Sequence, residues 1–421
     1  MIEKRIDVLL IRPERPDPRK CPVGPGDLFP PLGLGFLKAY ANLKGYRAEI
    51  LDNHVKPRPL CSAKETVRLV KEKNPRYVGV YVSSPSYQEA MILIQTLSKQ
   101  TDIPIIVGGP HYTVFPERAP DCVRYVVVGE GEQALLKILD GRAKERILRE
   151  PVLDDLNDLP LPSYDEFMDG SYEYSVPMFN MPPRIVTMNT SRGCPQRCLF
   201  CSVQNIWGRR YRTFSAHRIY EHVMGLIRDH GIAGIYFRED NFTCDPRRTH
   251  AFCELVLESG LNLYWACEAR ADTLRRDPHL LPHMAEAGCR GIFLGIESGS
   301  QRVLDLMEKG TTVEQNREVL KRCRELGIIT YASMCYGFPG EKEEDRQLTR
   351  EFLDETRPDH VSEAVYIGIP TSPIYEDIKK TGQYYHEDEA GFIFPRGYES
   401  MCRHFYGPND IRHIPREGLA Q

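Results

Sequence analysis

Short, almost uninterrupted apolar runs alternate with amphipathic segments through the first 145 residues. The apolar runs are IDVLLI, GYRAEILD, RYVGVYVSS, IPIIVGG and VRYVVVGEGE, and helical patterns lie between them. Runs rich in Val and Ile that lack polar alternation are typical of strands buried on both faces of a parallel sheet. The pattern therefore predicts a doubly wound α/β domain of about five strands, which should bind a ligand at the carboxyl ends of its strands.

A second series of strand and helix patterns begins after a proline-rich stretch. Residues 146–182 carry Pro at close intervals and show little periodicity, so we expect an extended linker there. Six strand patterns follow, each beside a helical pattern, at residues 184–190, 233–240, 261–270, 290–298, 328–338 and 360–369. Six βα units match a curved, partial (β/α)6 barrel better than a closed eight-unit barrel. We therefore expect domains at 1–145 and 183–375, and a short C-terminal extension at 376–421.

The composition adds few constraints. The chain has 421 residues, of which 41% are hydrophobic and 27% charged, and its net charge is -4. No excess of positive charge points to nucleic acid as the main partner. No apolar run approaches the ~20 residues that a membrane span requires, and the N-terminal run lacks a signal-peptide cleavage pattern. We expect a cytoplasmic protein that binds neither nucleic acid nor membrane.

Three predicted strand ends in the first domain are rich in small residues. Gly and Ser at such positions let a ligand approach the backbone closely. Each loop taken alone could be merely a tight turn, but three on one sheet edge favour a large, flat or extended ligand. The candidate binding residues in these loops are Ser83, Ser84, Tyr87, Gly108, Gly109, His111, Gly129, Glu130, Gly131 and Glu132.

Polar residues also follow the predicted barrel strands, where chemistry is concentrated in barrels of this kind. These candidates are Glu239, Asp240, Arg270, Glu297, Ser298 and Gly337, with Glu341 close behind. For each carboxylate, a structural ion pair across the barrel mouth is the alternative role.

Three of the thirteen cysteines, Cys194, Cys198 and Cys201, lie within eight residues, directly after the first predicted barrel strand. Positions i, i+4 and i+7 share one face of a helix, so the cysteines could be a buried stripe. Gly193 and Pro195 oppose a settled helix at the first cysteine, however. The sequence therefore favours a cysteine loop.

The number of cysteines in this loop narrows the choice of metal. A structural zinc site would use four ligands, and the next cysteine, Cys244, belongs to a different βα unit. An iron–sulfur cube normally takes one cysteine thiolate for each iron. Three thiolates therefore suit a [4Fe–4S] cluster that leaves one iron open to bind a substrate or cofactor.

These motifs together resemble a known enzyme family. CPQRCLFC has the CxxxCxφC form of radical S-adenosylmethionine (SAM) enzymes, and YFREDNFT, WACEARAD, GIESGSQRVLDLMEKGTT and YGFPGEKEED are similar to the strand-end motifs of the cobalamin-binding class. PPLGLGFLKAYANLKGY, VGGPHYTVFPE and VVVGEGE resemble the Rossmann-like (flavodoxin-like) B12 domain of that class. The resemblance covers roughly residues 5–375. It implies three cofactors: a [4Fe–4S] cluster, SAM and cobalamin.

The resemblance also implies roles for the residues around the cluster. The three cysteines would hold it, and its open iron would chelate the amino and carboxylate groups of SAM. Phe200 would pack near the adenine, Gly337 would clear space for the adenine, and Arg270 could neutralise a carboxylate.

The carboxylates at the other strand ends would also serve SAM. Glu239 or Asp240 would accept a hydrogen bond from the methionine amino group. Glu297 and Ser298 would face the ribose or the methionine.

One motif of older cobalamin-binding domains is missing from the sequence. There is no DxHxxG between the first strand and helix, and His54 follows the second strand instead. We therefore expect a cobalamin that has no histidine lower ligand. His111 would line the groove of the nucleotide tail or cap a turn.

The resemblance implies a C-methyltransferase in which a 5'-deoxyadenosyl radical abstracts hydrogen from an unactivated carbon and methylcobalamin donates the methyl group. A B12-dependent cyclase, oxidase or rearrangement enzyme that acts on a small molecule shares almost every motif. A methylthiotransferase would need a second cysteine trio, whereas the N-terminal region has only the scattered Cys21, Cys61 and Cys122. A non-catalytic sensor would not need an open cluster.

The compact chain suggests a peptide or protein substrate, such as a residue of methyl-coenzyme M reductase in methanogens; a small molecule is the alternative. An electron donor such as ferredoxin or flavodoxin would reduce the cluster.

Overall fold

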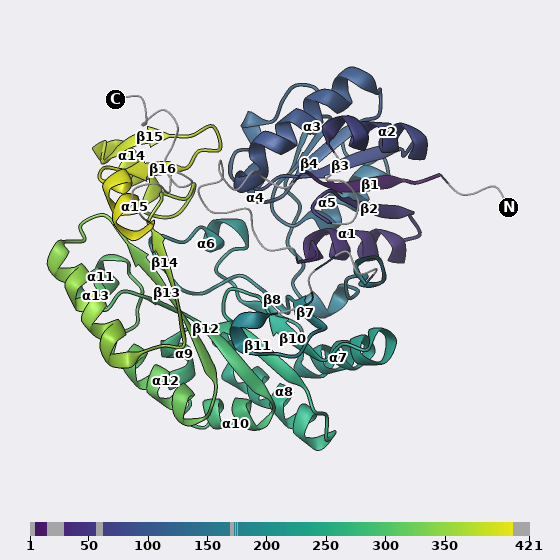
Figure 1. The fold of residues 1–421 in the computed structure, drawn as a ribbon. Coiled ribbons are helices and arrows are strands. Elements are labelled where there is room, and N and C mark those ends of the chain that lie inside the picture. Colours follow the sequence, from purple (N-terminus) through teal and green to yellow (C-terminus); the bar gives the residue numbers. More distant parts are fainter. Residues whose placement is uncertain are drawn as a thin grey trace.

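The computed structural model describes residues 5–14, 29–55, 62–168, 172, 174 and 176–406 (Figure 1). Two parallel six-stranded sheets and a small C-terminal extension make up this part of the chain. In the described part, no helix is both long enough and apolar enough to cross a lipid bilayer.

The first sheet has the strand order β2-β1-β3-β4-β5-β6, and all its pairs are parallel. Its strands are β1 (Val8–Arg12), β2 (Ala48–Asp52), β3 (Tyr77–Tyr81), β4 (Ile105–Gly108), β5 (Tyr125–Val127) and β6 (Ile147–Leu148). The doubly wound prediction is confirmed. The sixth strand was not predicted, because two residues inside the expected linker are too few to show a pattern.

Helices cover both faces of this sheet, which explains its unalternating apolar runs. Leu10 packs with α1 and α5 on one face, and its neighbour Leu9 packs with α2 and α3 on the other. Successive side chains of a strand point to opposite faces, so a sheet covered on both sides needs apolar residues at every position. The helices of this domain are α1 (Leu32–Leu43), α2 (Ala63–Lys73), α3 (Tyr87–Gln100), α4 (Pro110–Val114) and α5 (Gly131–Leu139).

The second sheet forms the partial barrel, with the parallel order β14-β13-β12-β11-β10-β7. All six predicted strands are confirmed. They are β7 (Ile185–Met188), β10 (Gly234–Phe237), β11 (Tyr264–Ala269), β12 (Cys289–Glu297), β13 (Ile329–Tyr336) and β14 (His360–Val365). Among the described strands β14 pairs only with β13, so the barrel is open at that edge.

Helices line the convex side of the barrel, as Figure 1 shows in teal and green. They are α7 (Ala216–His230), α8 (Pro246–Glu258), α9 (Ala271–Arg275), α10 (Leu280–Glu286), α11 (Gln301–Leu306), α12 (Val313–Glu325) and α13 (Glu343–Thr356). On the barrel side of the linker, Phe179 packs so closely on Gly291 that a Cβ there would lie 2.2 Å from the Phe179 ring. The linker thus helps to fill the barrel.

The C-terminal extension bridges the two sheets. It consists of α14 (Tyr375–Thr381), the antiparallel strands β15 (Tyr384–Glu387) and β16 (Ile393–Pro395), and α15 (Tyr398–Tyr406). Glu387 lies 3.7 Å from Arg118 of the first domain. Gly391 has φ +86°, and a Cβ there would lie 2.8 Å from the Phe115 ring, so the turn between the strands fits against the first domain only as glycine.

Candidate functional site

The three clustered cysteines lie in a loop, as the sequence predicted. The loop connects β8 (Ser191–Arg192) to the short helix α6 (Val203–Ile206), and β8 pairs antiparallel with β9 (Arg212–Thr213). No helix includes residues 193–202. Gly193 has φ +87°, and a Cβ there would lie 2.2 Å from the Arg210 carbonyl oxygen. The buried-stripe alternative is therefore wrong, and a close backbone approach explains the glycine.

The cysteine side chains converge on a cavity of about 220 Å3 in the mouth of the barrel. Cys198 is buried, whereas Cys194 and Cys201 are partly exposed. Within the described residues, no three His, Cys, Asp or Glu side chains are grouped closely enough to hold a single metal ion. Three cysteine side chains that line one cavity fit an iron–sulfur cluster, in which each cysteine binds a different iron.

Several predicted SAM-contacting residues line the same cavity. Phe200, Asp240, Arg270 and Glu297 are among them. The Lys309 ammonium, which the sequence reasoning missed, donates to the Glu297 carboxylate at 2.8 Å and lies 5.6 Å from the Phe200 ring centre. The cavity therefore combines cations, carboxylates and an aromatic ring next to the cysteines.

Three of the predicted contacts, Glu239, Ser298 and Gly337, are not among the residues that line this cavity. The Ser298 hydroxyl is buried and lies 3.1 Å from the Thr349 hydroxyl. The Gly337 amide donates to the Glu341 carboxylate at 2.6 Å, and a Cβ on Gly337 would lie 3.2 Å from the Met401 side chain of the extension. The structure gives Ser298 and Gly337 roles in local packing.

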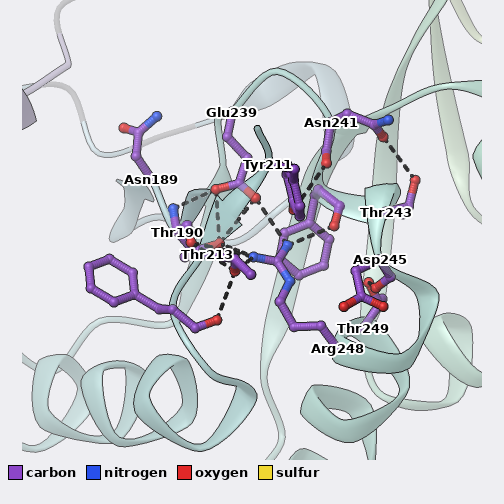
Figure 2. A network of polar contacts seen from close by, with 12 residues as sticks. Asn189, Thr190, Tyr211, Thr213, Glu239, Asn241, Thr243, Asp245, Arg248 and Thr249 are labelled. Carbon is purple, nitrogen blue, oxygen red and sulfur yellow. Dashed lines mark hydrogen bonds and ion pairs between the residues drawn. The ribbon is translucent and has the colours of Figure 1, made fainter. Parts of the chain in front are cut away.

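The neighbouring acids Glu239 and Asp240 have different surroundings. The Glu239 carboxylate accepts hydrogen bonds from the Thr190 amide and from its hydroxyl, the latter at 2.9 Å, and lies 3.1 Å from the Arg248 guanidinium. Figure 2 shows the carboxylate turned toward these partners, whose own network continues to Thr213. The Glu239 and Arg248 side chains are only 1% and 4% exposed. The structural ion pair is thus the better account of Glu239, and Asp240 remains the candidate for the SAM amino group.

A second, larger cavity of about 570 Å3 lies between the two domains. On one side it is lined by β1, β3, β4 and β5 near their carboxyl ends, and on the other by the barrel mouth. The predicted residues Gly108, Gly109, Gly129, Glu130, Gly131 and Glu132 all line it. The site lies beside the β1/β3 switch point of the sheet, where doubly wound folds bind large ligands. This cavity therefore fits a large, flat cofactor.

The structure does not bring the remaining loop residues into this cavity. Ser83, Ser84, Tyr87 and His111 are not among the residues that line it, and neither is His54. The Ser84 hydroxyl lies 3.2 Å from His111 Nδ1, and the rings of Tyr87 and His111 are 4.4 Å apart. Burial lowers the pKa of His111 to about 4, so its ring is neutral at pH 7. Tyr87 packs against the apolar cluster of the C-terminal extension, which makes this loop a packing surface.

A buried ion-pair network joins the loop of Glu130 and Glu132 to the cysteine loop. Arg192 lies 2.9 Å from Glu130 and 2.6 Å from Glu132, and Arg212 also pairs with Glu130. All four side chains are 11% exposed or less. Because Arg192 precedes Cys194 by two residues, this network links the two cavities structurally. Nothing in the sequence near the two arginines indicates that they pair with these carboxylates.

Two carboxylates, Asp240 and Glu268, line both cavities. The Tyr236 hydroxyl donates to Glu268 at 3.1 Å. The surrounding protein partly shields both carboxylates from bulk water, which raises the pKa of Asp240 to about 6, with help from the Glu239 charge, and that of Glu268 to about 7. Glu268 was missed, although one acid in the otherwise apolar strand YWACEA was a signal for it.

Comparisons with known proteins match both halves of the chain. A model described as the radical SAM superfamily matches residues 188–353, and one described as a B12 binding domain matches residues 25–139. An uncharacterized methyltransferase of Pyrococcus horikoshii is 27% identical over 395 residues, which cover 89% of this chain and 83% of the relative. An anaerobic magnesium-protoporphyrin IX monomethyl ester cyclase of Rubrivivax gelatinosus is 25% identical over 394 residues, which cover 87% of this chain and 69% of the relative.

A solved structure supports the same architecture. The radical SAM methyltransferase TsrM of Kitasatospora setae, solved with cobalamin and a [4Fe–4S] cluster bound, superposes with a TM-score of 0.70 and 18% identity. The superposition covers 92% of this chain and 76% of that one. At this level of identity the likeness shows the fold.

Proposed function

Because the chain is a cobalamin-dependent radical SAM enzyme, in which a B12-binding domain precedes a radical SAM domain, we propose that it is a C-methyltransferase. Its cofactors are a [4Fe–4S] cluster, SAM and cobalamin. When bound, the cluster and SAM supply a 5'-deoxyadenosyl radical, and cobalamin supplies the methyl group. The proposed reaction replaces hydrogen by methyl at an unactivated carbon.

The observation that carries this proposal is that the two cavities share Asp240 and Glu268. Methylation of a carbon radical needs the radical source and the methyl donor to face the same atom. A substrate held beside these two carboxylates would lie between the cysteine cavity and the cavity of the B12-binding domain. Fixing the reactants in this way supplies a large part of the catalysis that a protein can add to cofactor chemistry.

Within this proposal each group of side chains has a distinct task. The three cysteines hold the cluster, and Asp240 accepts from the SAM amino group. Glu268 accepts a hydrogen bond from a donor on the substrate, and the Tyr236 hydroxyl keeps its carboxylate in place. The glycines of the larger cavity allow close approach of the corrin ring.

For the substrate we favour a residue of a peptide or protein, such as one in methyl-coenzyme M reductase. The open edge of the barrel supports this choice, because His360, Val361, Glu363 and Ala364 of β14 are exposed. An edge strand offers unpaired backbone groups to an extended chain. The enzyme also needs a reductant for the cluster, and we propose a ferredoxin or flavodoxin.

A cyclase is the second candidate, because of the 25% identity to the magnesium-protoporphyrin ester cyclase. The products of SAM separate the two functions. Reduced, reconstituted protein would be incubated anaerobically with candidate peptides and, separately, with small molecules. A methyltransferase forms 5'-deoxyadenosine and S-adenosylhomocysteine at near parity with the methylated product. A cyclase forms 5'-deoxyadenosine without S-adenosylhomocysteine, and that result would overturn the proposal.

A further inference from the structure

The guanidinium of Arg270 contacts a cysteine of the cluster loop directly. Its Nη1 donates to Cys198 Sγ at 3.3 Å. Arg270 is 5% exposed and Cys198 is 7% exposed, and both line the 220 Å3 cavity. The contact joins the end of β11 to the cysteine loop, which are 72 residues apart in the chain. It therefore depends on the fold of the whole barrel.

The protein holds this guanidinium in place on its other two sides. Nε donates to the Asp272 carboxylate at 2.8 Å, and Nη2 donates to the backbone carbonyl of Lys309. The Asp272 side chain is 13% exposed, so this anchor is largely shielded from water. Because guanidinium is a rigid planar fork, fixing Nε and Nη2 also fixes the direction of Nη1. The protein itself thus directs Nη1 toward the cysteine.

We propose that Arg270 tunes the iron–sulfur cluster: it donates a charge-assisted hydrogen bond to the Cys198 thiolate and thereby raises the reduction potential of the cluster. Reduction adds negative charge to the cluster and its thiolates. A buried cation that donates an N–H group to one of those sulfurs stabilises the reduced form more than the oxidised form. Partners of this kind, one step beyond the metal ligands, are an established means of tuning metal centres.

This role goes beyond neutralising a carboxylate of SAM, and the two roles differ in what they require. A residue that serves only SAM changes the affinity for SAM and leaves the SAM-free cluster unaffected. A tuning residue changes the SAM-free cluster itself. The inference rests on the radical SAM assignment and not on methyl transfer, so its failure would leave the proposed reaction untouched.

The test is a redox titration of the reconstituted, full-length protein without SAM, with the reduced cluster followed by electron paramagnetic resonance. Arg270→Gln should shift the one-electron equilibrium about tenfold toward the oxidised cluster, which corresponds to a fall of about 59 mV in midpoint potential. Arg276→Gln is the matched control. Arg276 reaches the same Asp272 at 3.5 Å but is half exposed and does not line the cavity, so its loss should leave the potential unchanged.

Two outcomes would overturn the inference. One is an Arg270→Gln protein with full iron content, weakened SAM binding and the wild-type potential. The other is an equal shift in both variants, which would mean that distant charge alone acts. If Arg270→Gln does not take up a full cluster, Arg270→Lys replaces it, because an ammonium keeps the charge but cannot reproduce the planar three-way contact. Its potential should also fall, and a wild-type value would contradict the inference.

Discussion

The buried pair of Glu239 and Arg248 gives a quantitative prediction about stability. Glu239→Gln keeps the shape of the side chain but leaves the Arg248 charge without its partner at 3.1 Å. Breaking a buried ion pair in this way costs about 3–5 kcal/mol. In a domain of roughly 150–250 residues, a loss of 1 kcal/mol lowers the unfolding midpoint by about 2–4 °C. A loss of about 3 kcal/mol therefore corresponds to a fall of about 6–12 °C in the unfolding midpoint.

Tryptophan fluorescence during heating is a suitable assay, because the chain has two tryptophans. Trp265 is fully buried in the barrel, and Trp207 lines the larger cavity. The matched control is Asp240→Asn, which alters the adjacent acid at the cavity surface. It should not lower the unfolding midpoint, because the raised pKa of Asp240 means that the fold does not stabilise its charge. If Glu239→Gln unfolded at the same temperature as the wild type and had lost SAM binding, Glu239 would act on SAM and not in a structural ion pair.

Three further predictions concern the cavities. Gly33 lines the larger cavity, and a Cβ on it would meet no atom within 4 Å. An indole at this position would fill the cavity, so Gly33→Trp should expel cobalamin, while Gly33→Ala should retain it. The absorbance of protein-bound cobalamin measures both outcomes. Glu268 has a pKa raised to about 7 by burial and accepts hydrogen bonds best when ionised, so substrate affinity should fall as the pH drops through 7. Glu268→Gln should flatten this profile, and an unchanged profile would exclude Glu268. His54→Ala should keep the cobalamin spectrum, because His54 does not line the cavity; an altered spectrum would identify it as a cobalt ligand.

The sheets could be predicted from the sequence because their signals are local. Buried parallel strands need apolar residues at every position, and each run such as IDVLLI carries that pattern within itself. The signal for the cysteine loop was also local, because Gly193 and Pro195 oppose a helix around Cys194. The strand β6 was missed since its assignment depends only on pairing with β5.

The partners of charged side chains could not be predicted, because they come from distant parts of the chain. Glu130 meets Arg212 across 82 positions, and nothing near either residue indicates the other. Glu239 and Asp240 are adjacent, yet only the fold decides that one meets Arg248 and the other faces the cavities. In the same way, the small residues before Tyr87 predicted a ligand-binding loop, whereas the Tyr87 side chain packs against the C-terminal extension.

Whether cobalamin donates the methyl group to the substrate can be decided by a single turnover with labelled cofactor. The protein would be loaded with cobalamin that carries a deuterated methyl group. Its cluster would then be reduced, and unlabelled SAM and a substrate peptide would be added. Donation by cobalamin predicts a first product that carries the deuterated methyl group, with one 5'-deoxyadenosine formed for each product. An unlabelled methyl group in that first product, with the label still on cobalamin, would contradict it.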